Sequence, residues 1–165
     1  MKKVGKIMAL GAVAALAVKW KSIIKWIKSL SQDETESHVR LQCYYDIMTR
    51  WMQNKQEGLH IGDYLREKGI QKVAIYGHGK IGLLLYEDLI SENIKVVCFI
   101  EKGPMESYQS VDNTPVTSVE RNENIGEDAV IITPSFDKEY IEKNLRKNGW
   151  NSEILSFSSL LYEMT

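Results

Sequence analysis

The chain has 165 residues, of which 44% are hydrophobic and 26% are charged, and its formal net charge is −1. This length and composition fit one globular domain with a short appendage, and they exclude a disordered chain, a collagen and a polytopic membrane protein. The two cysteines, Cys43 and Cys98, cannot form a disulfide framework, and the sequence has no Cys-x-x-Cys pair for zinc.

The first 32 residues form a basic segment. Residues 1–32 carry seven lysines and no acidic residue, so their charge is +7 and that of the remaining chain is −8. An uninterrupted apolar run covers residues 7–18. In the following residues, 19–30, lysines lie on one face of a predicted helix, and another face is apolar: Trp20, Ile23, Ile24, Ile27 and Leu30. We expect this segment to bind lipid and not nucleic acid, because its lysines lie beside a long apolar run.

Four interpretations of residues 1–30 stay open at this point. A membrane span would be short, because twelve residues of helix reach about 18 Å and a hydrocarbon core is about 30 Å thick. A signal peptide fits the basic start and the small residues, but the lysines beyond any cleavage point argue against it. The remaining two are a helix lying in the membrane interface and a helix that packs on the domain or on another subunit. We favour association with a membrane, either across it or on its surface.

Residues 33–70 predict a helical lead-in to the domain. A polar, acidic break over residues 31–37 is followed by apolar residues at helical spacing over His38–Gln56. A second, short helix is predicted over Ile61–Lys68, and Gly69 stops it.

From residue 71 onward, short apolar runs alternate with helical patterns. Strands are predicted over Lys72–Tyr76, Lys95–Ile100, Pro115–Val119, Asp128–Thr133 and Glu153–Phe157. Helices are predicted over Ile81–Asn93, Phe136–Asn148 and Ser158–Glu163, the last capped by Ser158 or Ser159, with a loop over Gly103–Pro115. This alternation predicts βαβ units with right-handed crossovers. We therefore expect an α/β fold with a mainly parallel five-stranded sheet, strand order 3-2-1-4-5, and helices on both faces.

A glycine-rich loop joins the first predicted strand to its helix. Residues 77–82 read Gly-His-Gly-Lys-Ile-Gly and match the pattern G-x-G-x-x-G. In a dinucleotide fingerprint, Gly77 would allow the tight turn, Gly79 would let the backbone approach a pyrophosphate, and Gly82 would let the helix pack closely on the sheet. The free N–H groups at the start of the helix, near Ile81, would then face the phosphates.

The next strand ends in an acidic residue, 19 positions after the last glycine of the loop. This residue, Glu101, would accept hydrogen bonds from a ribose 2′-hydroxyl and would repel a 2′-phosphate, so the sequence favours NAD over NADP. The alternatives are a mononucleotide ligand, or a domain whose glycines serve turn geometry alone and whose pocket binds nothing.

Four further residues lie where a ligand would lie. His78 and Lys80 are inside the glycine loop and are candidate phosphate contacts, with solvent exposure as the equal alternative. Thr133 and Pro134 follow the fourth strand at the carboxyl edge of the sheet, where open α/β folds bind ligands. The alternative for this edge is an ordinary turn in which Ser135 caps the next helix.

No catalytic constellation accompanies these residues. Tyr140 is followed four residues later by Asn144 and not by lysine, so a catalytic Tyr-x-x-x-Lys pair is absent, and Cys98 in mid-strand predicts an inert core thiol. We find no Walker lysine-serine pair, no His-Glu-x-x-His and no nucleophile elbow. The candidate binding residues are Gly77, His78, Gly79, Lys80, Ile81, Gly82, Glu101, Thr133 and Pro134, and none is assigned to catalysis or to a metal.

Two segments carry a resemblance to a known family: residues 72–102, which read KVAIYGHGKIGLLLYEDLISENIKVVCFIEK, and residues 128–161, which begin DAVIITPSFDKEYIEKNLRKNGW. They resemble the NAD- or nucleotide-binding Rossmann domains of bacterial capsule and cell-envelope polysaccharide synthesis. The most similar type is the N-terminal domain of membrane-attached nucleotide-sugar epimerases and dehydratases, and CoA-binding-type Rossmann domains are close relatives. In that family the second strand usually ends in Asp, where this chain has Glu101.

The resemblance covers roughly residues 40–163 and implies that the domain over residues 71–165 is Rossmann-like. The sequence pattern places the lead-in over 33–70 and the basic segment over 1–32 before it. The resemblance also implies a non-catalytic module that binds NAD or a nucleotide-sugar and acts with a glycan-synthesis partner protein. The expected location is the cytoplasmic side of the membrane, peripheral or anchored by the N-terminus. The alternatives are an NAD-dependent oxidoreductase or nucleotide-sugar-modifying enzyme completed by a partner chain, and a structural interaction protein with an empty pocket.

Overall fold

The computed structural model describes residues 37–103, 110–120, 125–134 and 136–164. The basic segment over residues 1–32, and with it the predictions for residues 1–30, lies outside these ranges. Among the described residues, those from Tyr45 onward form one compact unit, which contains the whole sheet. None of the helices in the described ranges combines the length and the apolar character that crossing a membrane requires.

The two predicted lead-in helices are confirmed. A helix covers residues 37–56, and α2 covers Ile61–Glu67. Gly69 follows α2 with a φ of +77°, a left-handed conformation that commonly ends a helix and that glycine adopts without steric cost.

The sheet has six strands in the order β3-β4-β2-β1-β5-β6. The strands are β1 (Lys72–Tyr76), β2 (Lys95–Glu101), β3 (Ser110–Val111), β4 (Thr114–Ser118), β5 (Ala129–Ile132) and β6 (Glu153–Ser156). All neighbouring strands are parallel except β3 and β4. The five predicted strands are present within one residue of their expected bounds, and their predicted order is confirmed. The predicted number of five strands is wrong, because the short strand β3 adds a sixth. The fold is therefore mixed α/β with a mostly parallel sheet.

The loop predicted over Gly103–Pro115 is wrong at its end, because it contains the short strand β3. Asp112 and Asn113 have φ values of +46° and +67°, and the flanking residues Val111 and Thr114 pair in an antiparallel register. A two-residue turn with positive φ at both positions closes a β-hairpin, and Asn and Asp tolerate this conformation better than most residues.

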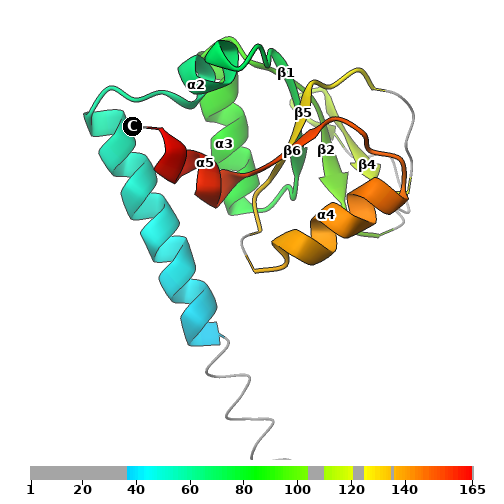
Figure 1. The fold of residues 1–165 in the computed structure, drawn as a ribbon, viewed down its shortest axis with the longest axis horizontal. Coiled ribbons are helices and arrows are strands. Elements are labelled where there is room, and N and C mark those ends of the chain that lie inside the picture. The colour runs from blue at the N-terminus through cyan, green and yellow to red at the C-terminus, as the bar shows by residue number, and fades with distance from the viewer. Residues whose placement is uncertain (1–36, 104–109, 121–124, 135, 165) are drawn as a thin grey trace, which may run out of the picture. The chain divides into compact units, whose positions relative to one another are not determined.

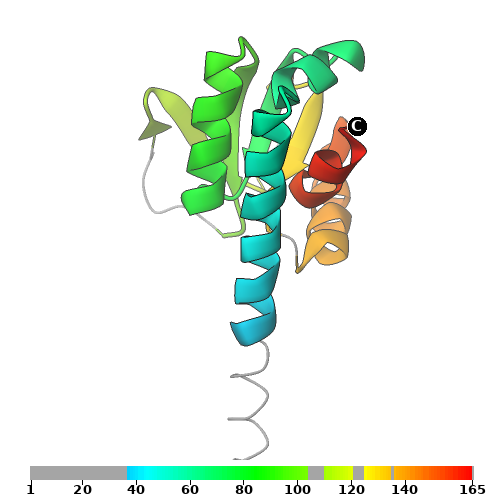
Figure 2. The same cartoon turned by 90° about the vertical axis from the view of Figure 1, so that its left-hand side faces the viewer.

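Helices cover both faces of the sheet. The helix α3 (Lys80–Ser91) follows β1, α4 (Lys138–Lys147) follows β5, and α5 (Phe157–Glu163) follows β6. Figures 1 and 2 show α3 and α4 on opposite sides of the strands. The predicted caps are wrong: Asp137 is the N-cap of α4 and Ser156 that of α5, and neither makes a side-chain capping hydrogen bond. Ser135 lies outside the described residues.

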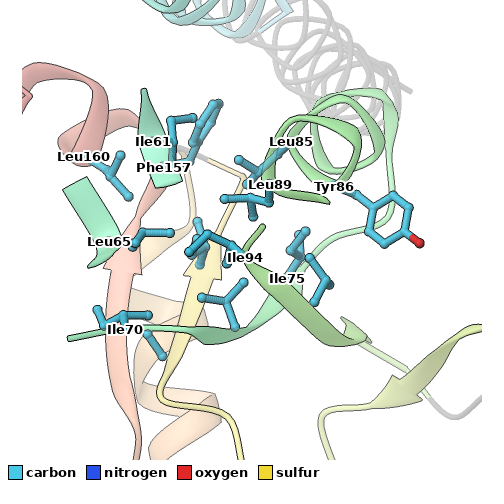
Figure 3. Packing of buried hydrophobic residues seen from close by; sticks show 14 of the residues in the cluster. Ile61, Leu65, Ile70, Ile75, Leu85, Tyr86, Leu89, Ile94, Phe157 and Leu160 are labelled. Carbon is cyan, nitrogen blue, oxygen red and sulfur yellow. The ribbon is translucent and has the colours of Figure 1, made fainter. Parts of the chain in front are cut away.

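Two hydrophobic clusters fill the two faces. The larger cluster joins alternate residues of β1, including Ile75, to the lead-in helices, α3 and α5 (Figure 3). The smaller cluster joins the other face of β1, through Ala74 and Tyr76, to Ile141 and Leu145 of α4. Side chains alternate between the faces of a strand, so the continuous apolar run of β1 supplies both clusters.

Polar contacts attach the end of the helix over residues 37–56 to the rest of the domain. The Trp51 indole donates a 3.0 Å hydrogen bond from Nε1 to Oδ2 of Asp88 on α3. Lys55 makes an ion pair with the other oxygen of the same carboxylate. Asn54 donates a 2.8 Å hydrogen bond to the carbonyl oxygen of Leu161 in α5. The lead-in helix is thus tied to two helices of the same face of the sheet.

Candidate functional site

The glycine loop lies at the carboxyl end of β1, the central strand at which the order of successive strands in the sheet reverses. The chain builds outward from β1 through β2 and β4 on one side, and through β5 and β6 on the other. In open α/β sheets, the crevice at such a reversal of strand order is the usual place for a ligand. The topology therefore puts residues 77–82 where the sequence pattern requires them.

The first and third glycines fix the shape of the turn. Gly77 has a φ of +96°, and its N–H donates a 2.9 Å hydrogen bond to the carbonyl oxygen of Ile100 at the end of β2. A Cβ atom on Gly82 would lie 1.9 Å from the carbonyl oxygen of Gly77. The close approach of α3 to the end of β1 is thus possible only without a side chain at residue 82.

The second glycine leaves the start of α3 open. Gly79 is the N-cap of α3, it makes no side-chain capping hydrogen bond, and a Cβ atom built on it would meet nothing within 4 Å. The N–H of Leu83 donates a 3.0 Å hydrogen bond to the carbonyl oxygen of Gly79, as the first i to i−4 bond of the helix does. The N–H groups of residues 80–82 precede this bond, so they and the positive end of the helix dipole are available to an anion.

Lys80 and Ile81 contribute in different ways. The Lys80 side chain is exposed at the first position of α3. The Ile81 side chain packs against the larger core cluster. Ile81 can therefore offer a ligand only its main-chain N–H, while Lys80 can offer its ammonium group as well.

Glu101 contacts the glycine loop through one carboxylate oxygen. Its Oε1 accepts a 2.9 Å hydrogen bond from the main-chain N–H of His78 and lies 2.5 Å from the Nδ1 atom of the same residue. Neither contact involves Oε2, and about one third of the Glu101 side chain is exposed, at 32%. The imidazole of His78 helps to hold Glu101 at the loop, and its contact with phosphate stays a prediction.

Thr133 and Pro134 lie beside Gly77. The Thr133 hydroxyl donates a 2.9 Å hydrogen bond to the carbonyl oxygen of Tyr76, and the Thr133 side chain is buried. A Cβ atom on Gly77 would lie 2.8 Å from Thr133 Oγ1 and 3.5 Å from Pro134 Cδ. These two residues therefore support the turn from the β5 side, and their contact with a ligand stays a prediction.

The same edge of the sheet holds a pair of residues that the sequence analysis did not select. The Nζ atom of Lys102 lies 5.1 Å from the ring centroid of Tyr140. Lys102 directly follows Glu101, and Tyr140 lies in the first turn of α4. Two features of the sequence could have indicated these residues: Lys102 is adjacent to the acidic residue, and Tyr140 is near the predicted start of a helix at the carboxyl edge of the sheet.

Two titratable groups near the centre of the sheet are held neutral. Burial raises the pKa of the Tyr76 hydroxyl, and the charges of Glu101, Tyr140 and Asp137 raise it further. Burial, with a smaller contribution from the charge of Glu127, raises the pKa of the Cys98 thiol to about 12. Because Cys98 is fully buried, the prediction of a core thiol is confirmed.

Two cavities formed by described residues lie away from the loop. One, of about 270 Å³, is lined by residues of the helix over 37–56 and of α3, and the other, of about 690 Å³, by residues of the α2 region and by Glu163 and Met164. Neither includes a residue of the glycine loop.

The residues at the loop fit a nucleotide diphosphate. Open space at Gly79 and main-chain donors of residues 80–82 suit a diphosphate, and the carboxylate of Glu101 beside them suits a ribose hydroxyl. What this arrangement offers chemically is binding and orientation of such a group.

Comparisons with known proteins identify a family. Residues 69–155, more than half of the chain, match the family described as C2185-like, N-terminal. Neither the curated proteins nor the solved structures contain a match to this chain. The matched residues include β1, the glycine loop, α3, β2 and Tyr140. The chain belongs to the C2185-like, N-terminal family.

Proposed function

We propose that this chain is a nucleotide-binding module of the Rossmann-like type. The ligand is a nucleotide with a diphosphate, such as NAD or a nucleotide-sugar, and its diphosphate binds at the start of α3. One observation carries the proposal: at the carboxyl end of the central strand, α3 begins at a glycine, Gly79, where a Cβ atom would meet nothing within 4 Å.

Glu101 supports a ribose-containing ligand. Its Oε1 holds the loop through His78, and in this proposal its Oε2 accepts hydrogen bonds from a ribose diol. A carboxylate at this position disfavours a 2′-phosphate because the two groups carry the same charge. Among dinucleotides, NAD is therefore the proposed ligand, and NADP binds more weakly.

The biological setting of the proposal rests on the resemblance to Rossmann domains of bacterial envelope polysaccharide synthesis. In that setting the chain is a non-catalytic module that acts with a glycan-synthesis protein. The lysine-rich segment over residues 1–30 would hold it at the cytoplasmic surface of the membrane.

Thermal unfolding with added ligands tests nucleotide binding. We expect NAD, NADH or a UDP-sugar to raise the midpoint more than NADP does, with CoA as a further comparison. A ligand at a hundredfold excess over its dissociation constant stabilises by about 2.7 kcal/mol. Gly79→Val fills the open space, so it should abolish this shift and leave the midpoint of the ligand-free protein nearly unchanged. No shift with any of these compounds contradicts the proposal.

Vesicle sedimentation tests the membrane surface. The full chain should sediment with vesicles that contain anionic lipid, and a shortened chain that begins at Ser31 should not. Equal sedimentation of the two chains would reject the role given to residues 1–30.

A further inference from the structure

We propose that Lys102 and Tyr140 form the part of the same site that binds the nucleotide base. This inference rests on the proposed function and deepens it, because it makes the ligand a nucleotide whose base is recognised, as opposed to a sugar phosphate or a free diphosphate.

The topology brings these two residues together from both sides of β1. Lys102 follows the end of β2, and Tyr140 lies in the first turn of α4, the helix after β5. Both β2 and β5 are hydrogen-bonded to β1 in parallel, so both segments leave the sheet at the edge that carries the glycine loop. The cation of Lys102 then lies over the ring of Tyr140, 5.1 Å from its centroid.

Contacts and chain adjacency link these residues in the same order as the groups of a nucleotide. The diphosphate donors of α3 are followed by Glu101, whose carboxylate contacts the loop at His78. Lys102 is the next residue in the chain, and its ammonium group contacts the ring of Tyr140. In a nucleoside diphosphate the groups follow in the sequence diphosphate, ribose and base, and each is covalently joined to the next. A ligand with its diphosphate at Gly79 and its ribose at Glu101 thus extends its base toward the Lys102–Tyr140 pair.

A second observation places Glu101 and Tyr140 around one region. Burial raises the pKa of the Tyr76 hydroxyl at the end of β1, and the charges of Glu101 and Tyr140 raise this pKa further. The acidic residue assigned to ribose and the aromatic residue assigned to the base therefore border the end of the same strand.

The exposure of the Tyr140 side chain is suited to stacking. Tyr140 is 57% exposed, and a large aromatic surface left to solvent gains from being covered. A base can stack on the ring, and the nearby ammonium group adds a cation–π contribution. An aromatic platform of this kind accepts any base face, and a purine, with the larger face, covers more of it.

Calorimetric titration of the full-length protein with ADP and with inorganic pyrophosphate tests the inference. Tyr140→Ala should weaken ADP binding about tenfold or more, the usual scale for losing one base–aromatic stack, and leave pyrophosphate binding unchanged. Tyr140→Phe keeps the ring and should bind ADP as the unsubstituted protein does.

Tyr162 on α5 provides a matched control. It is 58% exposed and also lies under a cation, with Arg50 Cζ 5.5 Å from its ring centroid. Tyr162 is not part of the glycine-loop edge, so Tyr162→Ala should leave ADP binding unchanged.

The possible results separate this inference from the proposed function. If the unsubstituted protein binds ADP and Tyr140→Ala binds it equally well, the base site is wrong and the nucleotide site stands. Equal losses of ADP and pyrophosphate in Tyr140→Ala also overturn the base site, because they show a distorted loop. If the unsubstituted protein binds neither compound, the proposed function fails and the base site fails with it.

Discussion

The carbonyl oxygen of Gly77 lies where a side chain on Gly82 would begin, 1.9 Å from the position of its Cβ atom. Gly82→Ala must therefore displace either the turn or the start of α3. We expect a loss of unfolding free energy of roughly 1–3 kcal/mol, the usual cost of overpacking, measured by urea denaturation.

Gly79→Ala is the control for this prediction. A Cβ atom on Gly79 meets nothing within 4 Å, and its φ of −70° is open to any residue. This variant should lose much less stability than Gly82→Ala, because alanine is only a poorer N-cap residue than glycine. Equal midpoints for the Gly82→Ala and Gly79→Ala variants would mean that the turn is looser than the structure shows.

Glu101→Gln tests the role of charge in the choice of nucleotide. The amide oxygen can still accept the hydrogen bond from the His78 N–H, but the variant no longer repels a 2′-phosphate. We expect NADP to gain on NAD by roughly tenfold in relative affinity, since one pair of like charges near a protein surface is worth at least about 1.4 kcal/mol. Calorimetric titration of both compounds measures the ratio, and Glu87→Gln on the exposed face of α3 is the control. An unchanged ratio would show that Glu101 does not face the ribose.

Trp51→Phe removes a buried hydrogen bond between the lead-in helix and α3, together with part of a buried indole ring. The ring contact with Phe157, now edge-to-face with centroids 4.9 Å apart, can be kept, but the 3.0 Å hydrogen bond to Asp88 is lost. Because Asp88 is only 8% exposed, its carboxylate is left without one donor, and we expect a destabilisation of roughly 1–3 kcal/mol in urea denaturation. Met52→Ala removes an exposed neighbour and should change stability far less. If Trp51→Phe also leaves the midpoint unchanged, neither the indole hydrogen bond nor the lost part of the ring contributes to stability.

Asp128 connects the stability of the sheet to acid pH. Its Oδ2 accepts hydrogen bonds from the main-chain N–H groups of Gln71, at 2.9 Å, and Lys72, at 2.8 Å, and these lower the pKa of the carboxyl group below its usual value of 3.8. The stabilisation is therefore complete above the pKa of the unfolded chain and is lost as the pH falls through the lower pKa of the folded protein.

Asp128→Asn should reduce the unfolding free energy by roughly 1 kcal/mol at neutral pH, because the site is exposed and solvent weakens the interaction. The difference from the unsubstituted protein should shrink when urea denaturation is repeated below pH 3.8. Asp112→Asn, in the exposed turn after β3, should show no such pH dependence. A difference for Asp128→Asn that stays constant with pH would reject the linkage.

The strands could be predicted because each is a short apolar run, and Lys72–Tyr76 and Lys95–Glu101 agree with prediction within one residue. The strand β3 was missed because two residues carry no periodic pattern, although Asp112-Asn113 is a recognisable hairpin turn. The caps at Asp137 and Ser156 were missed because the sequence offers several polar residues near each helix start and only packing chooses among them.

The site divides in a similar way. The glycine loop and Glu101 could be predicted because they belong to one β-strand–helix–β-strand unit. In such a unit the spacing along the chain determines that the loop and the end of the second strand lie close together. The proximity of Lys102 to Tyr140 could not, since 38 positions separate them and no local pattern links the end of β2 to the first turn of α4. The contact of Trp51 with Asp88 is of the same kind, and both depend on the assembled sheet.

The central place of β1 has a consequence for motion. Strands β2 and β4 on one side, and β5 and β6 on the other, are held together in the sheet by the hydrogen bonds of this single strand. A molecule that touched both Glu101 and Tyr140 would bridge the two halves independently of β1. Amide hydrogens of β2 and β5 would then exchange with deuterium more slowly and in concert, although most of them lie far from the bound molecule.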